Sequence, residues 1–385
     1  MSLGLLQSAL MADTTRDGFE VQTNVLLKPY TTFKIGGPAK YFVKARTYDE
    51  VRAALSWHKA QRCGLFVLGG GSNILISDRG FDGLVMHIAM DGISVEREDA
   101  ETVTLSIAAG ERWDNVVGFA VEHGWWGIEN LSHIPGQAGA ALVQNIGAYG
   151  QQVSDALRSA EVVDTQTHEA LSLSPADCEF GYRKSIFNST RKNQFVIIGL
   201  TLQLKKRGRR NLAYPDVKAY FESHGIGRPS LPAIRHAIIE IRDRKFPFPR
   251  EERGGNAGSF FKNLVLSAGE YRALATRIQG DFGPADFKRL AGVRRGGAHA
   301  ERIRIPTAFL IDICGLKGWQ EGEAKVNDSQ PLVLLNMGGA TSADVLRLAK
   351  HIRRTIYRRT GVEISLEPEL VGFSQAEISE CMSLG

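Results

Sequence analysis

The chain is expected to fold as an α+β protein with more than one domain, and three observations predict this. Its 385 residues exceed the roughly 250–300 residues that one hydrophobic core usually serves. With 43% hydrophobic and 23% charged residues, it is not a disordered, collagen-like or coiled-coil chain. Strand and helix patterns follow one another without a sustained alternation, which favours α+β over a doubly wound sheet.

The N-terminal half carries the patterns of strands and two helices. Residues 1–22 show no regular pattern and are expected to be a flexible extension. Amphipathic spacing predicts helices over Tyr48–Gln61 and Trp113–His123, the second of which ends before Gly124. Apolar runs and alternation predict strands at Tyr41–Val43, Leu65–Leu68, Ile74–Ile76, Leu84–Ile88, Ile93–Glu96 and Val103–Ala108.

The C-terminal half continues with both kinds of element. Helices are expected over Leu231–Lys245, which Pro247 and Pro249 stop, and over Ser342–Arg359. The proline pair marks the boundary of a last domain. Residues 374–385 look like a loose tail. Strand-like runs are Ala160–Asp164, Phe195–Leu204 and Val362–Leu366, and Lys205–Arg210 is expected to be a basic hairpin tip.

Charge, cysteines and hydropathy exclude several classes of protein. The net charge of +5 suits an anionic small ligand but is too weak to indicate nucleic-acid binding. The four cysteines form no close pair, and the nine histidines form no metal-binding motif, so neither a disulfide scaffold nor a metal site is expected. No apolar run reaches the roughly 20 residues of a membrane helix, and there is no secretory signal, so a cytoplasmic location is expected.

Two glycine-rich segments are candidate ligand sites. Gly69–Asn73 follows an apolar strand, and its consecutive backbone N–H groups form a nest suited to a pyrophosphate, although a tight hairpin turn is an equal alternative. In the long irregular segment Gly124–Gly150, the small residues of Ile134–Ala140 and Asn145–Gly150 let the backbone approach a flat ring, beside which Tyr149 could pack. The alternative is a connection that is packed only by its own side chains.

Three further segments carry candidate chemistry. In Phe180–Phe187, Arg183 could recognise a carboxylate or stabilise an oxyanion, or could form a structural salt bridge. Ser259 lies between a glycine-rich turn and two phenylalanines, which favours a proton or hydrogen-bond donor over a nucleophile, with helix capping as the alternative. Glu367 and Glu369 point the same way in an extended chain and could orient an acid, or could be surface charge.

Taken together, these motifs resemble the UDP-N-acetylenolpyruvoylglucosamine reductase (MurB) family of flavoenzymes. The resemblance runs in order from about Asn24 to Phe373. Its elements are Tyr30–Gly37, Leu68–Asn73, Ile134–Gly136, Gln144–Gly150, Phe180–Phe187, Gly255–Asn263 and Leu366–Glu369. The chain departs from the family's commoner residues at Gln137-Ala138 and at Ala141–Val143, and Arg294–Ala300 resembles an insertion.

The resemblance implies a PCMH/vanillyl-alcohol-oxidase-type FAD-binding fold in two subdomains, plus a C-terminal α+β substrate-binding domain. The implied boundaries are 1–22 for the extension, 23–88 and 89–246 for the FAD-binding subdomains, 247–373 for the substrate-binding domain and 374–385 for the tail. FAD would be bound tightly but not covalently. The protein would be a monomer with a small-molecule substrate and no membrane or nucleic-acid partner.

The resemblance also implies a role for individual residues. The catalytic residues would be Arg183, Ser259 and Glu369. FAD would be bound by Leu68, Gly69, Gly70, Gly71, Ser72, Asn73, Ile134, Pro135, Gly136, Gly139, Gln144, Asn145, Gly147 and Tyr149. The nucleotide-sugar substrate would be bound by Tyr182, Tyr214, Arg242, Lys245, Asn263 and Gln320, and Tyr214 resembles the diphosphate-clamping tyrosine of one branch of the family.

The implied activity is a UDP-N-acetylmuramate dehydrogenase of peptidoglycan precursor synthesis. NADPH would reduce FAD, whose N5 would pass a hydride to C3 of the enolpyruvyl ether of UDP-N-acetylglucosamine, and Ser259 would protonate C2. Three alternatives remain at this point: another flavin enzyme of the same fold, a nucleotide-sugar-binding protein without catalysis and, with little support from the charge, a nucleic-acid-binding protein.

Overall fold

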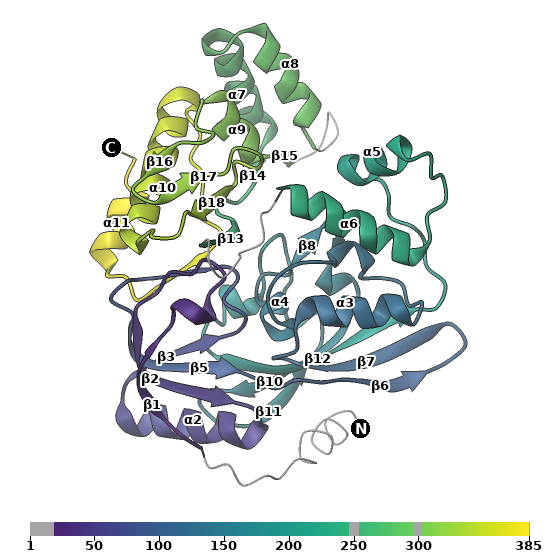
Figure 1. Cartoon of the computed structure of the whole chain (residues 1–385), viewed down its shortest axis with the longest axis vertical. Coiled ribbons are helices and arrows are strands. Elements are labelled where there is room, and N and C mark those ends of the chain that lie inside the picture. The colour runs from purple at the N-terminus through teal and green to yellow at the C-terminus, as the bar shows by residue number, and fades with distance from the viewer. Residues whose placement is uncertain (1–18, 246–253, 296–301, 385) are drawn as a thin grey trace. The chain divides into compact units, whose positions relative to one another are not determined.

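The computed structural model describes residues 19–245, 254–295 and 302–384, which divide into two compact units (Figure 1). The first unit contains the described residues up to Val25, residues 39–70 and residues 82–243. The second unit contains 26–38, 71–81 and the described residues after 243. Two short stretches of the N-terminal third therefore belong to the C-terminal unit. The division into two subdomains, a substrate-binding domain and a tail stays a prediction.

A four-stranded sheet and one helix begin the first unit. Helix α2 (Tyr48–Gln61) starts at a capping box, in which the Thr47 hydroxyl accepts from the Glu50 backbone and the Glu50 carboxylate accepts from Thr47. Val51 and Leu55 of this helix are fully buried in the core. The strands, in spatial order, are β1 (Gln22–Leu26), β2 (Pro38–Ala45), β5 (Phe81–Ile88) and β3 (Gly64–Leu68).

A five-stranded antiparallel sheet forms the larger part of the first unit. Helices α3 (Trp113–Glu122) and α4 (Ala138–Val143) pack with it, and α4 contacts its central strand and one neighbouring strand (Figure 1). The side chains of both sheets and these helices share one hydrophobic core. The strands, in spatial order, are β11 (Ala170–Leu173), β10 (Leu157–Asp164), β12 (Phe195–Lys205), β7 (Thr102–Ala108) and β6 (Ile93–Glu98).

The last part of the first unit is a small helical layer. Helices α5 (Pro215–Ser223) and α6 (Leu231–Lys245) bury Val217, Phe221 and Ile238 in a separate small core that also contains Tyr149. The expected hairpin tip at Lys205–Arg210 is wrong, because β12 ends at Lys205 and the next element is a helix rather than a paired strand.

The second unit contains a four-stranded sheet and two strand pairs. The sheet order is β13 (Gly255–Ser259), β18 (Val333–Asn336), β17 (Ala324–Val326) and β16 (Gln320–Glu321). The pairs are the antiparallel β14 (Leu264–Leu266) with β15 (Ile303–Ile305) and the parallel β19 (Glu369–Val371) with β4 (Ile74–Ile76). The helices are α7 (Ala268–Asp281), α8 (Pro284–Val293), α9 (Thr307–Ile313), α10 (Ser342–Thr360) and α11 (Gln375–Met382).

Two expectations for the C-terminus are wrong. Val362–Leu366 is not a strand, because only Leu366 forms an isolated bridge and the strand starts at Glu369. The expected loose tail contains helix α11, which starts at a Ser374–Glu377 capping box and buries Cys381. The guanidinium of the fully buried Arg353 donates to the Cys381 carbonyl at 2.8 Å and so ties α10 to this helix.

The remaining structural expectations stand as follows. The α+β class is confirmed, as are the expected helices and the other expected strands, to within a few residues at their ends. The long segment 124–150 is less irregular than expected, since it contains α4 and the short strand β8 (Gly147–Ala148), which pairs with β9 (Gln151–Gln152). Residues 1–18, Pro247, Pro249 and most of Arg294–Ala300 lie outside the described residues. None of the described helices has the length and apolar character that crossing a membrane requires.

Candidate active site

The two glycine-rich segments expected to bind flavin meet within the first unit. A Cβ atom on Gly70 would lie 2.7 Å from the Cα atom of Gly136, and one on Gly69 would lie 2.9 Å from the Cβ atom of Ala140. One on Gly139 would lie 2.7 Å from the Cβ atom of Ala109. These backbones approach more closely than any side chain would allow, which explains the glycines at these positions.

The loop that starts at Gly69 does not form a hairpin. Strand β3 before it and strand β4 after it belong to different sheets, which excludes the hairpin-turn alternative. Gly71 has a φ of +58°, and a Cβ atom there would lie 2.1 Å from the Tyr30 carbonyl oxygen. Asn73 Nδ2 donates to the Glu367 carbonyl at 3.2 Å. The end of this loop is therefore held by backbone contacts and one amide side chain.

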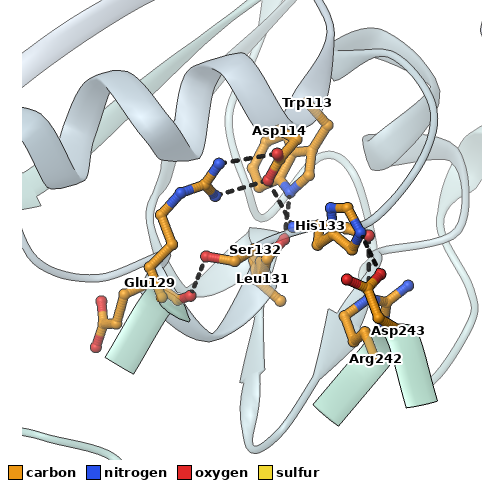
Figure 2. A network of polar contacts seen from close by, with 9 residues as sticks. Trp113, Asp114, Glu129, Leu131, Ser132, His133, Arg242 and Asp243 are labelled. Atoms are coloured by element: carbon orange, nitrogen blue, oxygen red, sulfur yellow. Dashed lines mark hydrogen bonds and ion pairs between the residues drawn. The ribbon is translucent and has the colours of Figure 1, made fainter. Parts of the chain in front are cut away.

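A polar network holds the turn that leads into Ile134–Gly136 (Figure 2). His133 has a φ of +62°, a left-handed conformation that a non-glycine residue adopts only when its surroundings hold it there. Asp114 accepts from the His133 backbone N–H and from both terminal nitrogens of Arg235, at 2.7 and 2.8 Å. Arg242 Nε donates to the His133 carbonyl at 3.0 Å, and His133 Nε2 lies 2.9 Å from Asp243 Oδ1 (Figure 2).

The electrostatics of this network follow from its burial. Burial raises the pKa of Asp114, but hydrogen bonds from Arg235 and His133 outweigh it and hold this pKa below its ordinary value. Burial also lowers the pKa of Arg242. Interactions with Tyr149, Asp114 and Asp243 offset part of this decrease. Helix α6 therefore supplies the cations that keep the His133 turn in place.

The Arg183 guanidinium donates to the second flavin segment. Its own φ is +53°, and its Nη2 donates to the Gly147 carbonyl at 3.2 Å. The guanidinium carbon lies 5.6 Å from the centre of the Tyr182 ring. Asn145 Nδ2 donates to the Gly181 carbonyl at 3.2 Å, which joins the two segments a second time.

Tyr149 and Tyr214 lie next to each other. Their rings meet edge to face, with centres 5.1 Å apart and planes at 83°. Tyr149 is buried, and burial raises the pKa of its phenol to about 12 although Arg242 opposes the shift. Tyr214 precedes α5 and is 41% exposed. The structure therefore brings an expected flavin residue and an expected substrate residue together.

In the second unit, Ser259 lies at a β-bulge. The register of β13 against β18 shifts between Asn256 and Ser259, and Asn256 Oδ1 accepts from the Gly258 backbone N–H at 2.9 Å. Phe260 and Phe261, which follow, are fully buried. Among the described residues, no group makes a hydrogen bond with the Ser259 hydroxyl. Bulges often re-aim a side chain beside a site, and Ser259 caps no helix, which excludes the capping alternative.

The segment that carries Glu369 is bonded to the segment that carries Ser259. The Glu367 backbone N–H donates to the Phe260 carbonyl at 3.0 Å, and Lys262 N–H donates to the Ser365 carbonyl at 2.9 Å. Glu369 itself begins β19 and donates from its N–H to the Asn73 carbonyl at 3.1 Å. Ser259, Glu369 and the end of the first glycine loop thus belong to one bonded framework.

The expected substrate residues of the second unit differ in how they are held. Asn263 Oδ1 accepts from the Thr307 N–H at 3.1 Å, so the amide nitrogen of Asn263 is turned away from that bond. The Lys245 carbonyl accepts from Asn327 Nδ2 at 3.2 Å. Gln320 is exposed and donates to the Gly322 carbonyl of its own hairpin at 2.8 Å.

Sequence reasoning missed the residues that hold these segments. Asn130 is fully buried and donates through Nδ2 to the carbonyls of Tyr149 and Asn211, both at 2.8 Å. Asp114 and Arg235, described above, hold the other segment. Nothing in the local sequence marks these three residues, because each acts on a segment that lies far from it in the chain.

The residues present fit a flavin dinucleotide. Gly69 and Gly70 pack so closely against the segment of Gly136 and Ala140 that a Cβ atom on either would collide with it. Beside it, the buried oxygen of the Gln137 carboxamide has no hydrogen-bond partner among the described residues. A glycine loop of this kind offers backbone N–H groups rather than side chains, which suits the pyrophosphate of a dinucleotide.

Comparisons with known proteins identify the family of the chain. A model described as "FAD binding domain" matches residues 39–173, and one described as "UDP-N-acetylenolpyruvoylglucosamine reductase, C-terminal domain" matches residues 249–371. The enzyme of that name from Flavobacterium johnsoniae is 35% identical over 91% of this chain and 100% of its own length. The one from Chromobacterium violaceum is 38% identical over 91% of this chain and 98% of its own.

A solved structure supports the fold. The crystal structure of UDP-N-acetylenolpyruvylglucosamine reductase (MurB) from Thermus caldophilus aligns with a TM-score of 0.61, at 24% identity, over 91% of this chain and 98% of that one. The expected FAD-binding fold with a C-terminal domain is thereby confirmed. From the relatives and the two matching models together, this chain belongs to the UDP-N-acetylenolpyruvoylglucosamine reductase (MurB) family.

Proposed function

We propose that this chain is the FAD-dependent oxidoreductase that converts the enolpyruvyl ether of UDP-N-acetylglucosamine into UDP-N-acetylmuramate, with NADPH as hydride donor. This is a step of peptidoglycan precursor synthesis. Relatives that carry this reductase name match the chain over nearly their whole length. The observation that carries the proposal is the bulge at Ser259, whose following residue is bonded to the segment that bears Glu369.

The chemistry that bound FAD supplies is hydride transfer, from NADPH and then to C3 of the enolpyruvyl double bond. The protein must hold this cofactor and stabilise the charge that develops at C2. Leu68–Asn73, Ile134–Gly136, Gly139, Gln144, Asn145, Gly147 and Tyr149 are the residues proposed to hold it. Their close backbone packing supports this role, because it leaves the cradle no freedom to collapse.

Ser259 is proposed to donate the proton to C2. A hydroxyl is a weak acid, so it can act only on a strongly basic carbon that is held beside it. Arg183 is proposed to stabilise the enolate-like charge directly, and Glu369 to do so as a protonated hydrogen-bond donor. The absence of a hydrogen bond to the Ser259 hydroxyl among the described residues supports this assignment, since the proton is not already engaged.

The nucleotide sugar is proposed to bind through six side chains. Tyr214, Arg242 and Lys245 suit its diphosphate, because a phenol and two cations pair with phosphate oxygens. The amide nitrogen of Asn263 is oriented by Thr307 and would donate to the substrate. Tyr182 and Gln320 complete the proposed set.

The half-reactions of a Ser259→Ala variant test this function. Removing the proton donor is expected to slow reoxidation of the flavin by the enolpyruvyl substrate by about 10²–10⁴-fold. Reduction of the flavin by NADPH should stay within about twofold, since no proton from Ser259 is needed there. Stopped-flow absorbance under anaerobic conditions, first with NADPH and then with substrate, measures both rates.

Ser365→Ala is the matched control. Ser365 is exposed in the same unit and contributes its carbonyl, not its hydroxyl, to the Lys262 hydrogen bond. Both half-reactions of this variant should match those of the wild type. Equal losses in the two half-reactions of Ser259→Ala would make Ser259 structural, and a wild-type protein that holds no FAD would remove the proposed function altogether.

We also propose that the chain acts as a monomer in the cytoplasm, where NADPH and the nucleotide sugar are found. The mass of the purified protein by light scattering tests the monomer. The proposed division into two FAD-binding subdomains and a substrate-binding domain rests on the resemblance of the sequence to the MurB family.

A further inference from the structure

Two asparagines join the segments that carry Tyr149 and Tyr214, whose rings lie next to each other. Tyr149 has a φ of +47°, and Gly150, the next residue, has a φ of +84°. A left-handed conformation at a non-glycine residue persists only where its surroundings hold it. Tyr214 is exposed, and its side chain does not cap helix α5. The contacts that join the two segments therefore set where the Tyr214 ring lies.

Asn130 supplies the buried half of this connection. It lies in the 3₁₀-helix η2 (Glu129–Leu131) and is fully buried. Its amide nitrogen donates to the carbonyls of Tyr149 and Asn211, both at 2.8 Å. A carbonyl oxygen only accepts, so both hydrogens of the amide are used and the orientation of the amide is determined. The Asn130 backbone N–H donates to Gln151 Oε1 at 2.7 Å, which fixes the asparagine itself.

Asn211 supplies the half that faces the surface. Its Nδ2 donates to the Gly150 carbonyl at 2.9 Å, and a Cβ atom on Gly150 would lie 2.9 Å from the same nitrogen. Leu212, the next residue, packs against the small core that contains Tyr149. The chain is therefore anchored as far as the second residue before Tyr214.

We propose that Asn130 and Asn211 are positioning residues, which hold the Tyr214 ring where it meets the diphosphate of the substrate. The inference rests on the proposed function to the extent that Tyr214 is a substrate-binding residue. Without these hydrogen bonds, the segment before Tyr214 would have to be ordered each time the substrate binds, and the entropy lost there would weaken binding. Loss of the Asn211 bond alone would leave FAD binding intact, since Asn130 still holds Tyr149.

Substitution of the half-buried Asn211 tests the proposal without disturbing the core in which Asn130 is buried. Asn211→Ala removes the donor, and Asn211→Asp keeps the shape of the side chain but presents only acceptors to the Gly150 carbonyl. Asn211→Ala is expected to raise the KM of the enolpyruvyl substrate by about fivefold, as loss of one hydrogen bond does, and Asn211→Asp by more. The rate of flavin reduction by NADPH should stay within about twofold.

Asn115→Ala is the matched control. Asn115 is exposed on helix α3, and its amide donates one hydrogen bond, to Glu111 Oε1 at 2.9 Å. This variant should have the KM of the wild type. Tyr214→Ala then separates positioning from a general loss of stability, because Asn211→Ala should raise KM no further in the Tyr214→Ala background. An undiminished effect in that background would overturn the proposal, as would an unchanged KM in Asn211→Asp.

A second measurement uses the apoprotein and does not depend on activity. Arg209 is exposed in the segment before Asn211, where trypsin can cut. Release of this segment should speed cleavage after Arg209 about fivefold in Asn211→Ala relative to wild type and to Asn115→Ala. Equal cleavage rates would overturn the proposal and leave the proposed function standing if wild type turns over the substrate. A wild type that does not turn over the substrate removes the proposed function whatever the cleavage rates, so the two failures are distinguishable.

Discussion

Two glycines, one in each unit, are required for different reasons. In the first unit, Gly70 is packed so that a Cβ atom would lie within 2.7 Å of the Gly136 backbone. In the second unit, Gly258 has a φ of +71°, yet a Cβ atom there would meet nothing within 4 Å. Gly70 is needed for close contact, whereas Gly258 is needed only for the backbone conformation that turns the chain at the Ser259 bulge.

This difference corresponds to the two proposed ligands. A cofactor that stays bound through every cycle is suited to a rigid cradle with no spare volume, whereas a substrate that enters and leaves needs space beside the reacting hydroxyl. Loss of packing should therefore affect the flavin segments most, and loss of conformation should affect the Ser259 segment most. Three changes test this distinction.

Of the three changes, low pH is expected to lower the stability of the first unit the most. His87 on β5 pairs in register with Leu68, directly before the first glycine loop, and burial, with a contribution from Lys44, lowers its pKa from 6.5 to about 4. Between these two values the unfolded state binds a proton that the folded state does not. The folded state therefore has its full stability above pH 6.5. Its free energy of unfolding falls by up to about 3 kcal/mol as the pH drops towards 4.

Urea unfolding of the wild type and of His87→Gln between pH 7.5 and pH 4 measures this effect. The variant, which cannot titrate, should lose less stability over that range. His236→Gln is the matched control, because His236 is 69% exposed on α6, and its pH dependence should equal that of the wild type. Identical pH profiles for wild type and His87→Gln would contradict the assignment.

Gly70→Ala is expected to come next. Its Cβ atom would collide with the Gly136 backbone, which cannot yield as a flexible side chain does, and overpacking of this kind costs about 1–3 kcal/mol. The dissociation constant of FAD should rise by about tenfold or more, measured by fluorescence titration of the apoprotein. Gly227→Ala is the control, because a Cβ atom there meets nothing within 4 Å. Full FAD affinity in Gly70→Ala would show that the cradle is not as tight as the structure indicates.

Gly258→Ala should have the smallest effect, and one of a different kind. An alanine at φ +71° is strained by about 1 kcal/mol but meets no neighbour, so the free energy of unfolding should fall by that amount while FAD affinity is unchanged. Gly292→Ala, in helix α8 and equally open, controls for the added methyl group and should not destabilise the protein. If Gly258→Ala weakened FAD binding as much as Gly70→Ala, the contrast between the two glycines would be lost.

The local elements could be predicted from the sequence because their causes are local. Helix α2 has the bounds that its amphipathic spacing predicts, and the Thr47–Glu50 capping box at its start lies within the same stretch of chain. The same signal, Ser374 followed by Glu377, was present before α11 and could have prevented the expectation of a loose tail. The flavin loops and Ser259 were also named as candidates from their residue types, whereas their roles came from the resemblance to a family.

Only the tertiary structure decided which distant segments meet. The pairing of Glu369 with Ile74, the hydrogen bond of Asn73 to Glu367, and the contact of Gly70 with Gly136 join residues with no local signal for one another. The register shift that aims Ser259 and the amide of Gln137 that is held by Ile88 are also of this kind. The physical reason is that capping and periodicity act over a few residues, whereas strand pairing and close packing are set by which surfaces the whole chain can bury together.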